Sequence, residues 1–166
     1  MNPLERWPFA AVRRNHALEH ATITILSQRN PGLRLVGRSD WSGFTLYGPV
    51  SSDEVRAAVD SALKRLQSGE AGLAVHPRCG TNLATGFVLA GLASYAALSG
   101  KRRSILQRAV QLALGLTAAS ILAQPLGETL QERVTTSLDV AKLHVTQIRR
   151  LQRGDVVVHR IETAQE

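Results

Sequence analysis

The sequence predicts an α+β fold in which two small polar parts flank a two-helix transmembrane hairpin. Residues 81–100 and residues 109–127 carry no charged side chain, and each run is long enough to span a bilayer. The sequence before and after them alternates between helical and strand periodicity, which is typical of a small mixed fold. We therefore expect an N-terminal α+β unit over residues 1–80, the hairpin over residues 81–127, and a C-terminal helix and β-hairpin over residues 128–166.

The N-terminal unit is expected to open with a helix and a β-hairpin. Residues 8–28 contain good helix formers with no glycine or proline after Pro8, and a Pro-Gly pair then punctuates the chain. Residues 33–37 and 43–48 alternate in polarity and are rich in strand formers, with turn-forming residues between them. This pattern predicts a first helix followed by two antiparallel strands.

A second helix and a third strand are expected to complete this unit. Ser51 is a suitable N-cap, and Asp53 and Glu54 follow it as acids in a first helical turn. Apolar side chains then recur at helical spacing, at Val55, Val59, Leu63 and Leu66. The short run of residues 72–76 predicts a returning strand. The predicted order of the unit is therefore α-β-β-α-β.

The composition of residues 81–127 suits closely packed helices inside a membrane. Small residues recur along both apolar runs, and they include Gly86, Gly91, Ala93 and Gly115. A buried hairpin in a soluble protein is the alternative, because alanine-rich helices are less hydrophobic than leucine-rich ones. Two consecutive uncharged runs of spanning length favour the membrane interpretation.

The C-terminal part is expected to form one helix and a β-hairpin. Residues 128–143 continue with a helix-forming composition, and residues 143–149 and 156–161 alternate on either side of a turn centred on Gly154. An antiparallel membrane hairpin returns the chain to the side that it left. We therefore expect the C-terminal part to dock on the N-terminal unit and to pair with its sheet.

The net charge of +7 does not by itself indicate nucleic-acid binding. Lys101, Arg102, Arg103 and Arg108 lie in the short connection between the apolar runs, where basic residues commonly flank a membrane. The sequence has no cluster of Lys and Arg interleaved with aromatic residues that could stack on bases. We therefore expect the lipid bilayer as a partner and no nucleic acid.

The sharpest local pattern is H-A-L-E-H over residues 16–20, which places His16 and His20 four residues apart on one helical face. The order H-x-x-E-H is the inverse of the H-E-x-x-H zinc-protease motif, in which both histidines bind zinc and the glutamate deprotonates a bound water. Two interpretations are open. The histidines are metal ligands with Glu19 as a catalytic base, or they make ordinary hydrogen bonds in a helix.

A second pattern, H-P-R-C-G-T-N over residues 76–82, joins the N-terminal unit to the first apolar helix. If Thr81 or Asn82 caps that helix, Cys79 lies at its positive end, where the helix dipole favours a thiolate. The predicted ligands of one zinc or other divalent transition-metal site are His16, His20, His76 and Cys79. In the alternative interpretation the segment is a turn and a cap, with Cys79 a small buried side chain.

These motifs resemble those of a known bacterial family. The segments N-H-A-L-E-H-A-T (residues 15–22), G-F-T-L-Y-G (residues 43–48) and H-P-R-C-G-T-N (residues 76–82) precede two apolar helices. Together they are similar to an uncharacterised membrane-protein family of cyanobacterial and Chloroflexota-type genomes. The resemblance covers most of the chain and implies a bacterial membrane protein, without an established activity or substrate.

A weaker similarity, to inverted-motif zinc peptidases, is confined to residues 16–20. The third zinc ligand of those enzymes is typically a downstream glutamate on another helix. Glu54 and Glu70 are poor counterparts, so His76 or Cys79 would have to serve here. That departure weakens the case for proteolysis.

Two functions from different classes are compatible with these observations. The first is a membrane-embedded metal-binding protein, which would be a zinc-dependent hydrolase or peptidase if Glu19 acted as a general base beside an open ligand position. The second is a non-enzymatic membrane scaffold, either a homo-oligomer or a subunit of a larger membrane complex.

The expected location is the bacterial cytoplasmic membrane, as an integral protein. No secretory signal is recognisable near the start of the sequence, which favours polar units on the cytoplasmic side. The positive-inside rule, applied to Lys101, Arg102 and Arg103, favours the opposite orientation.

Overall fold

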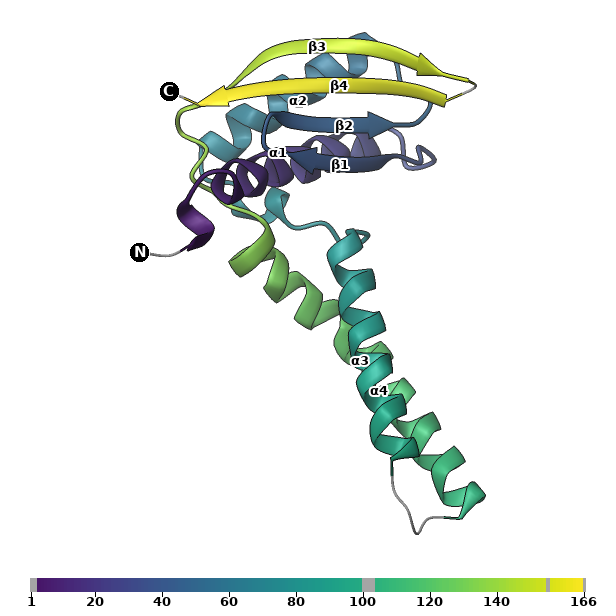
Figure 1. Cartoon of the computed structure of the whole chain (residues 1–166). Coiled ribbons are helices and arrows are strands. Elements are labelled where there is room, and N and C mark those ends of the chain that lie inside the picture. The colour runs from purple at the N-terminus through teal and green to yellow at the C-terminus, as the bar shows by residue number, and fades with distance from the viewer. Residues whose placement is uncertain (1–2, 100–103, 155, 166) are drawn as a thin grey trace. The chain divides into compact units, whose positions relative to one another are not determined.

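The computed structural model describes residues 3–99, 104–154 and 156–165 (Figure 1). The chain divides into two compact units. The first combines Met1–His76 with Glu132–Glu166, and the second is Pro77–Gln131. The first unit is a mixed α+β structure, and the second contains the apolar hairpin.

Two helices of the first unit follow the predicted pattern. Helix α1 (Phe9–Arg29) comes after the short 3₁₀ helix η1 (Pro3–Glu5), and it ends just before the Pro-Gly pair. Helix α2 (Ser52–Gln67) begins with a complete capping box, in which the Ser51 hydroxyl accepts from the Glu54 N–H and the Glu54 carboxylate accepts from the Ser51 N–H. Both predicted helices are confirmed, with their ends shifted by about one residue.

A four-stranded antiparallel sheet completes the first unit, in the order β1-β2-β4-β3 (Figure 1). Its strands are β1 (Val36–Asp40), β2 (Gly43–Tyr47), β3 (Leu143–Arg153) and β4 (Val156–Gln165). Strand β4 pairs with β2, so the C-terminal hairpin extends the N-terminal sheet as expected.

Strand β1 begins three residues later than predicted, and it includes Ser39 and Asp40, which were expected in the turn. The turn is tighter because the Asp40 carboxylate accepts hydrogen bonds from both the backbone N–H and the hydroxyl of Ser42. The structure therefore corrects the position of β1.

The core lies between the helices and one face of the sheet. Phe44 is opposite Ile161, and Leu46 is opposite His159, so these four fully buried side chains share that face. Helix α1 packs against β1 and β2, and α2 packs against β3. The helices contribute to this core with residues that include Ala17, Leu18, Leu26, Val55, Val59 and Ala62.

The predicted third strand over residues 72–76 is wrong. Ala71–Ala74 form a short 3₁₀ helix, η2, in which the Leu73 N–H donates to the Glu70 carbonyl. This turn packs on α1 instead of pairing with the sheet. Leu73 and Ala74 are buried, so the apolar run reflects burial against a helix. Periodicity alone cannot separate such a run from a short strand.

The second unit is a pair of apolar helices, α3 (Gly80–Leu98) and α4 (Ile105–Leu130). Among the described residues, two helical stretches are long and apolar enough to cross a membrane, Gly80–Leu98 and Ile105–Thr135. Only 6% of each candidate window is buried, so these helices do not have the enclosure typical of a soluble core.

Small residues bring α3 and α4 close together. A Cβ added at Gly115 would lie 3.0 Å from the Cβ of Ala93, and one added at Gly86 would lie 3.4 Å from the Cβ of Ala123. This contact is the one expected of small residues in packed membrane helices. Lys101, Arg102 and Arg103, on which the positive-inside argument depends, lie outside the described residues.

The predicted helix over residues 128–143 forms only in part. Helix α4 passes into a π-helical turn, η3 (Gln131–Thr135), and the chain is irregular between residues 136 and 142. The Ser137 N–H donates to the carbonyl of Arg13 in α1, and the Arg13 guanidinium donates to the carbonyl of Arg133. Contacts with α1 therefore replace the helical hydrogen bonds in this segment.

Candidate metal-binding site

Helix α1 places two of the predicted ligands side by side. His16 and His20 are one helical turn apart, and their ring centroids are separated by 4.2 Å in an edge-to-face arrangement. One ligand nitrogen of each ring lies within 4.8 Å of the other. His20 is buried and His16 is half-buried. The first motif therefore forms a pair of imidazoles that a single ion could bridge.

Each imidazole is held by a backbone carbonyl. Nδ1 of His16 lies 3.0 Å from the carbonyl oxygen of Thr135, and Nδ1 of His20 lies 2.7 Å from that of Ala74. A carbonyl oxygen can only accept, so Nδ1 must donate in both rings. The neutral ring then carries its lone pair on Nε2. Metal-binding histidines are commonly fixed in this way, with one ring N–H donated to a carbonyl or carboxylate.

The third predicted ligand also belongs to the first unit. The His76 ring centroid lies 5.9 Å from that of His20. The 3₁₀ helix η2 ends two residues before His76, and its last residue, Ala74, supplies the carbonyl that holds His20. One turn therefore fixes the orientation of His20 and also leads directly to His76.

Cys79 belongs to the second unit, where it is itself the N-cap of α3. Its Sγ accepts from the Thr81 N–H at 3.4 Å, so the cap is two or three residues earlier than the sequence suggested. Cys79 follows His76 by three positions in the sequence, and that length of chain spans at most about 10 Å. Cys79 is therefore tethered near His76 by the covalent chain alone.

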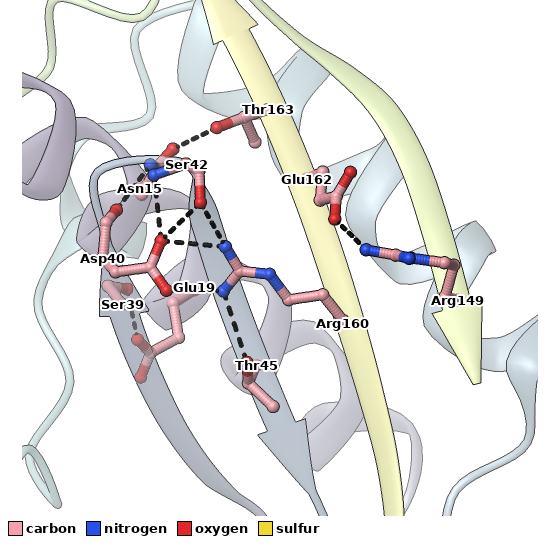
Figure 2. Close-up of polar contacts among 10 residues, drawn as sticks. All are labelled: Asn15, Glu19, Ser39, Asp40, Ser42, Thr45, Arg149, Arg160, Glu162 and Thr163. Carbon is pink, nitrogen blue, oxygen red and sulfur yellow. Dashed lines mark hydrogen bonds and ion pairs between the residues drawn. The ribbon is translucent and has the colours of Figure 1, made fainter. Parts of the chain in front are cut away.

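Glu19 is directed to the sheet. Its Oε2 accepts from the Ser39 hydroxyl at 2.5 Å (Figure 2). Its Oε1 occupies the space beside Gly37, where an added Cβ would lie only 2.0 Å away. The side chain is 5% exposed, and this burial raises the pKa of Glu19, while Ser39 and the nearby His16 partly oppose the shift. Glu19 thus fastens α1 to β1 through a carboxylate that is sheltered from water.

A polar network fixes the part of α1 that precedes His16. The Asn15 side chain donates to the carbonyl of Asp40 at 2.8 Å and accepts from the Thr163 hydroxyl at 2.6 Å (Figure 2). The carboxylate of Asp40 pairs with Arg160 at 2.7 Å. Partial burial opposes ionisation of Asp40, but the bonds from Arg160 and Ser42 outweigh it and lower its pKa. The network connects α1 to β1 and β4, and so positions His16 and Glu19.

Two further histidines, His144 and His159, lie on the strands β3 and β4. His144 is exposed at the start of β3, with Nδ1 3.4 Å from the Lys142 carbonyl. His159 is fully buried on β4, with Nε2 3.2 Å from the Ser52 hydroxyl. Each has its own partner.

The end of the second motif builds the hairpin. The Asn82 side chain donates to the Pro77 carbonyl at 2.9 Å and accepts from the Gln131 amide at 2.6 Å. A Cβ at Gly127 would lie 2.2 Å from Asn82 Oδ1, so α4 needs a glycine there. The sequence singled out Asn82 as a cap and gave no indication of its contact with Gly127 and Gln131.

Several residues that shape the site escaped the sequence analysis. The carbonyls of Ala74 and Thr135 have no sequence signature, because every residue carries one. Gly37 and Ser39 have a weak signature, since glycine inside a strand often marks a close approach by another group. Gly37 and Ser39 are two residues apart on β1 and therefore share one face of the strand. Correct bounds for β1 would have identified this face as the one that contacts Glu19.

The comparisons with known proteins agree with the resemblance of the motifs. A family model described as "Domain of unknown function (DUF6391)" matches residues 11–148. An uncharacterized protein of Picosynechococcus sp. is 37% identical over 139 residues, a match that covers 76% of this chain and 66% of the relative. The chain therefore spans just under two thirds of that relative's length. No solved structure matches the chain significantly. The family match includes most of α1, both motifs and both apolar helices, and the chain belongs to this family of unknown function.

Proposed function

We propose that the protein is an integral protein of the bacterial cytoplasmic membrane that binds a divalent transition metal, with zinc the expected ion. One observation carries the proposal. His16 and His20 are adjacent, and a backbone carbonyl holds Nδ1 of each ring, so that both lone pairs lie on Nε2. Two histidines that only stabilise a helix need not be in the same tautomer. Two histidines that bind one metal through Nε2 must both carry their proton on Nδ1.

His76 and Cys79 are the proposed additional ligands. The His76 ring is within reach of His20, and Cys79 follows three residues later in the chain. Imidazole nitrogen and thiolate sulfur are both ligands that zinc accepts, and four such donors suit its tetrahedral geometry. Softer donors of this kind disfavour magnesium and calcium, which prefer oxygen.

The number of ligands decides between a structural and a catalytic site. Four protein ligands make a closed, structural site, and three leave one position for water. Bound zinc would then supply hydroxide near neutral pH. In that version the Glu19 carboxylate would have to turn from Ser39 toward the metal-bound water, where it would accept the proton of the water and return it to the leaving amine of a peptide or amide. Support comes from its burial and raised pKa, which suit a group that exchanges protons.

A membrane scaffold is the second candidate function, and one observation favours it. The close contacts of Gly115 with Ala93 and of Gly86 with Ala123 resemble the small-residue seams of membrane helix assemblies. Outward-facing apolar residues of α3 and α4 would then contact lipid, a second copy of the chain, or another subunit.

Metal content tests the proposal most simply. The full chain, purified in detergent, is expected to carry about one equivalent of zinc, as one site requires. The variants His20→Ala and Cys79→Ser should both lose most of it. His144→Ala is the matched control, because it removes an exposed imidazole of the same unit, and it should retain the metal. A metal-free wild type of normal thermal stability would leave only the scaffold.

Glu19→Gln separates the two versions of the metal site. This substitution keeps the size of the side chain and removes its charge, so metal content should not change. If the site is catalytic, cleavage of a panel of fluorogenic peptides should fall by about 10²-fold or more, the usual loss for a missing general base. Unchanged cleavage with the metal retained would exclude Glu19 as the base.

A further inference from the structure

The first unit carries two exposed tryptophans, although this side chain usually buries most of its surface. Trp7 is 75% exposed and Trp41 is 61% exposed. They flank a shallow pocket of about 310 Å³, which is also lined by Ala11, Arg14, Leu143 and Thr163. The chain contains no other tryptophan.

This pocket lies beside the segment through which the chain enters the unit from α4. The Arg13 guanidinium donates to the Arg133 carbonyl at 3.2 Å, and the Arg13 carbonyl accepts from the Ser137 N–H at 3.1 Å. Arg14, in the pocket lining, pairs with Asp139 at 3.2 Å. Helix α4 ends at Leu130, and the three residues from there to Arg133 span at most about 10 Å. The segment that contacts Arg13 and Arg14 is therefore joined to the end of an apolar helix by only a few residues.

We propose that the Trp7–Trp41 pocket rests in the interfacial layer of the bilayer, against the glycerol and carbonyl groups of phospholipids. This inference rests on the proposed membrane insertion of the hairpin. Tryptophan favours that layer because its ring is apolar while its indole N–H finds an acceptor there. Phe9, 57% exposed in the first turn of α1, adds apolar surface two residues after Trp7.

The contact is aromatic and not electrostatic. Arg14 is the cation of the pocket lining, and its Nη1 already pairs with Asp139. A cation with an acidic partner adds little attraction to an anionic headgroup. Burial of indole depends weakly on ionic strength, whereas attraction between exposed charges is screened by salt. The tryptophans should therefore stay in the lipid at high salt.

Fluorescence of the full chain reports on this pocket alone, because both tryptophans flank it. The chain is reconstituted into vesicles of phosphatidylethanolamine and phosphatidylglycerol that contain lipids spin-labelled near the headgroup or deep in the acyl region. We expect blue-shifted emission, loss of most fluorescence to the shallow label, a smaller loss to the deep label, and little loss to aqueous iodide. Trp7→Phe and Trp41→Phe should each retain this pattern, and high salt should not change it.

Val36 provides a matched control. It is 66% exposed at the opposite end of β1 from Trp41. Val36→Trp in a Trp7→Phe, Trp41→Phe background places one reporter elsewhere on the same unit. We expect iodide to quench this reporter strongly and the lipid labels to quench it weakly.

Three results would overturn the inference. Iodide quenching of Trp7 and Trp41 as strong as that of the control would show that the pocket faces water. Protection from iodide and from both lipid labels would show that protein covers it. Equal lipid quenching of all three reporters would show no preference for this pocket. Extraction of the chain from vesicles by alkaline carbonate would instead contradict membrane insertion itself, and with it the proposed function.

Discussion

Two helix contacts, one in each unit, place a polar side chain directly against a glycine. In the first unit the Glu19 carboxylate lies 2.0 Å from the position that a Gly37 Cβ would occupy. In the second unit the Asn82 amide lies 2.2 Å from the corresponding position at Gly127. The same packing device thus brings α1 onto a strand in one unit and α3 onto α4 in the other.

The two polar groups differ in what they can do. Asn82 is a neutral amide that donates to the Pro77 carbonyl and accepts from Gln131, so it can hold two helices together but cannot titrate. Glu19 is ionisable, burial raises its pKa, and it follows His16 by three residues and precedes His20. Asn82 therefore has a structural role in the second unit, whereas Glu19 is a candidate functional residue of the first unit.

Gly37→Ala is expected to cause the largest loss of stability. The three nearest atoms to the new Cβ all belong to the Glu19 side chain, at 2.0 to 2.7 Å, so the carboxylate must move into an environment without its Ser39 partner. We expect a loss of about 3 kcal/mol in the free energy of unfolding, as for overpacking with a lost buried hydrogen bond. Thermal unfolding of the detergent-purified protein measures the change.

A double-mutant cycle identifies the cause. Glu19→Ala removes all three contacts, so Gly37→Ala should cost little in that background, whereas Glu19→Gln keeps the volume and should give no rescue. An equal cost of Gly37→Ala in all three backgrounds would show that Glu19 does not pack there.

Gly127→Ala should reduce stability less than Gly37→Ala does, and a second substitution should restore less of the lost stability. Two of the nearest atoms belong to the Asn82 side chain, but the Asn82 Cα lies at 2.8 Å and cannot be removed by substitution. We expect a cost of about 2 kcal/mol, of which Asn82→Ala restores only part. Helix content and thermal unfolding of the detergent-purified protein measure this loss of stability. Complete rescue would mean that the two helix backbones are not in close contact at this position.

The smallest effect concerns pH and involves His159 of the first unit, whereas Asn82 and Gln131 of the second unit do not titrate. Burial lowers the pKa of His159 below its ordinary 6.5, and the charge of Arg150 lowers it further. The unfolded chain therefore binds the proton more tightly than the folded chain. The contribution of His159 to stability is complete above pH 6.5 and is lost as the pH falls from there toward the folded pKa.

His159→Phe should reduce the loss of stability that occurs as the pH falls below 6.5. His144→Phe, at an exposed position, should leave it unchanged, and both are compared in the presence of a chelator so that metal binding does not contribute. Thermal unfolding on either side of pH 6.5 gives the difference. If the wild type and His159→Phe lost stability equally at acid pH, His159 would not be the group responsible for the loss.

The elements with strong local signals were predictable from the sequence. The Ser51–Glu54 capping box identified the start of α2, and the uncharged runs identified α3 and α4. The segment of residues 72–76 was mistaken for a strand because a run of five residues is too short to show a period that distinguishes a strand from a buried turn. Strand β1 was displaced because Ser39 and Asp40 have turn propensity, which pairing with β2 overrides.

The candidate site was predictable where it depends on spacing and not where it depends on tertiary contact. The separation of His16 and His20 indicated a shared helical face, which the structure confirms. The carbonyls that fix the two rings come from residues 74 and 135, far apart in sequence and without a chemical signature. The contact of Glu19 with Gly37 is likewise a tertiary event, because it requires β1 to lie across α1.

The central claim is that one ion binds Nε2 of His16 and His20, with His76 and Cys79 as its other ligands. X-ray absorption of the zinc-loaded full chain tests it directly. We predict nitrogen scatterers at about 2.0–2.1 Å and one sulfur at about 2.3 Å, with the sulfur shell absent in Cys79→Ser and the nitrogen shell reduced in His20→Ala. Zinc surrounded only by oxygen, or a spectrum unchanged by both substitutions, would contradict the claim.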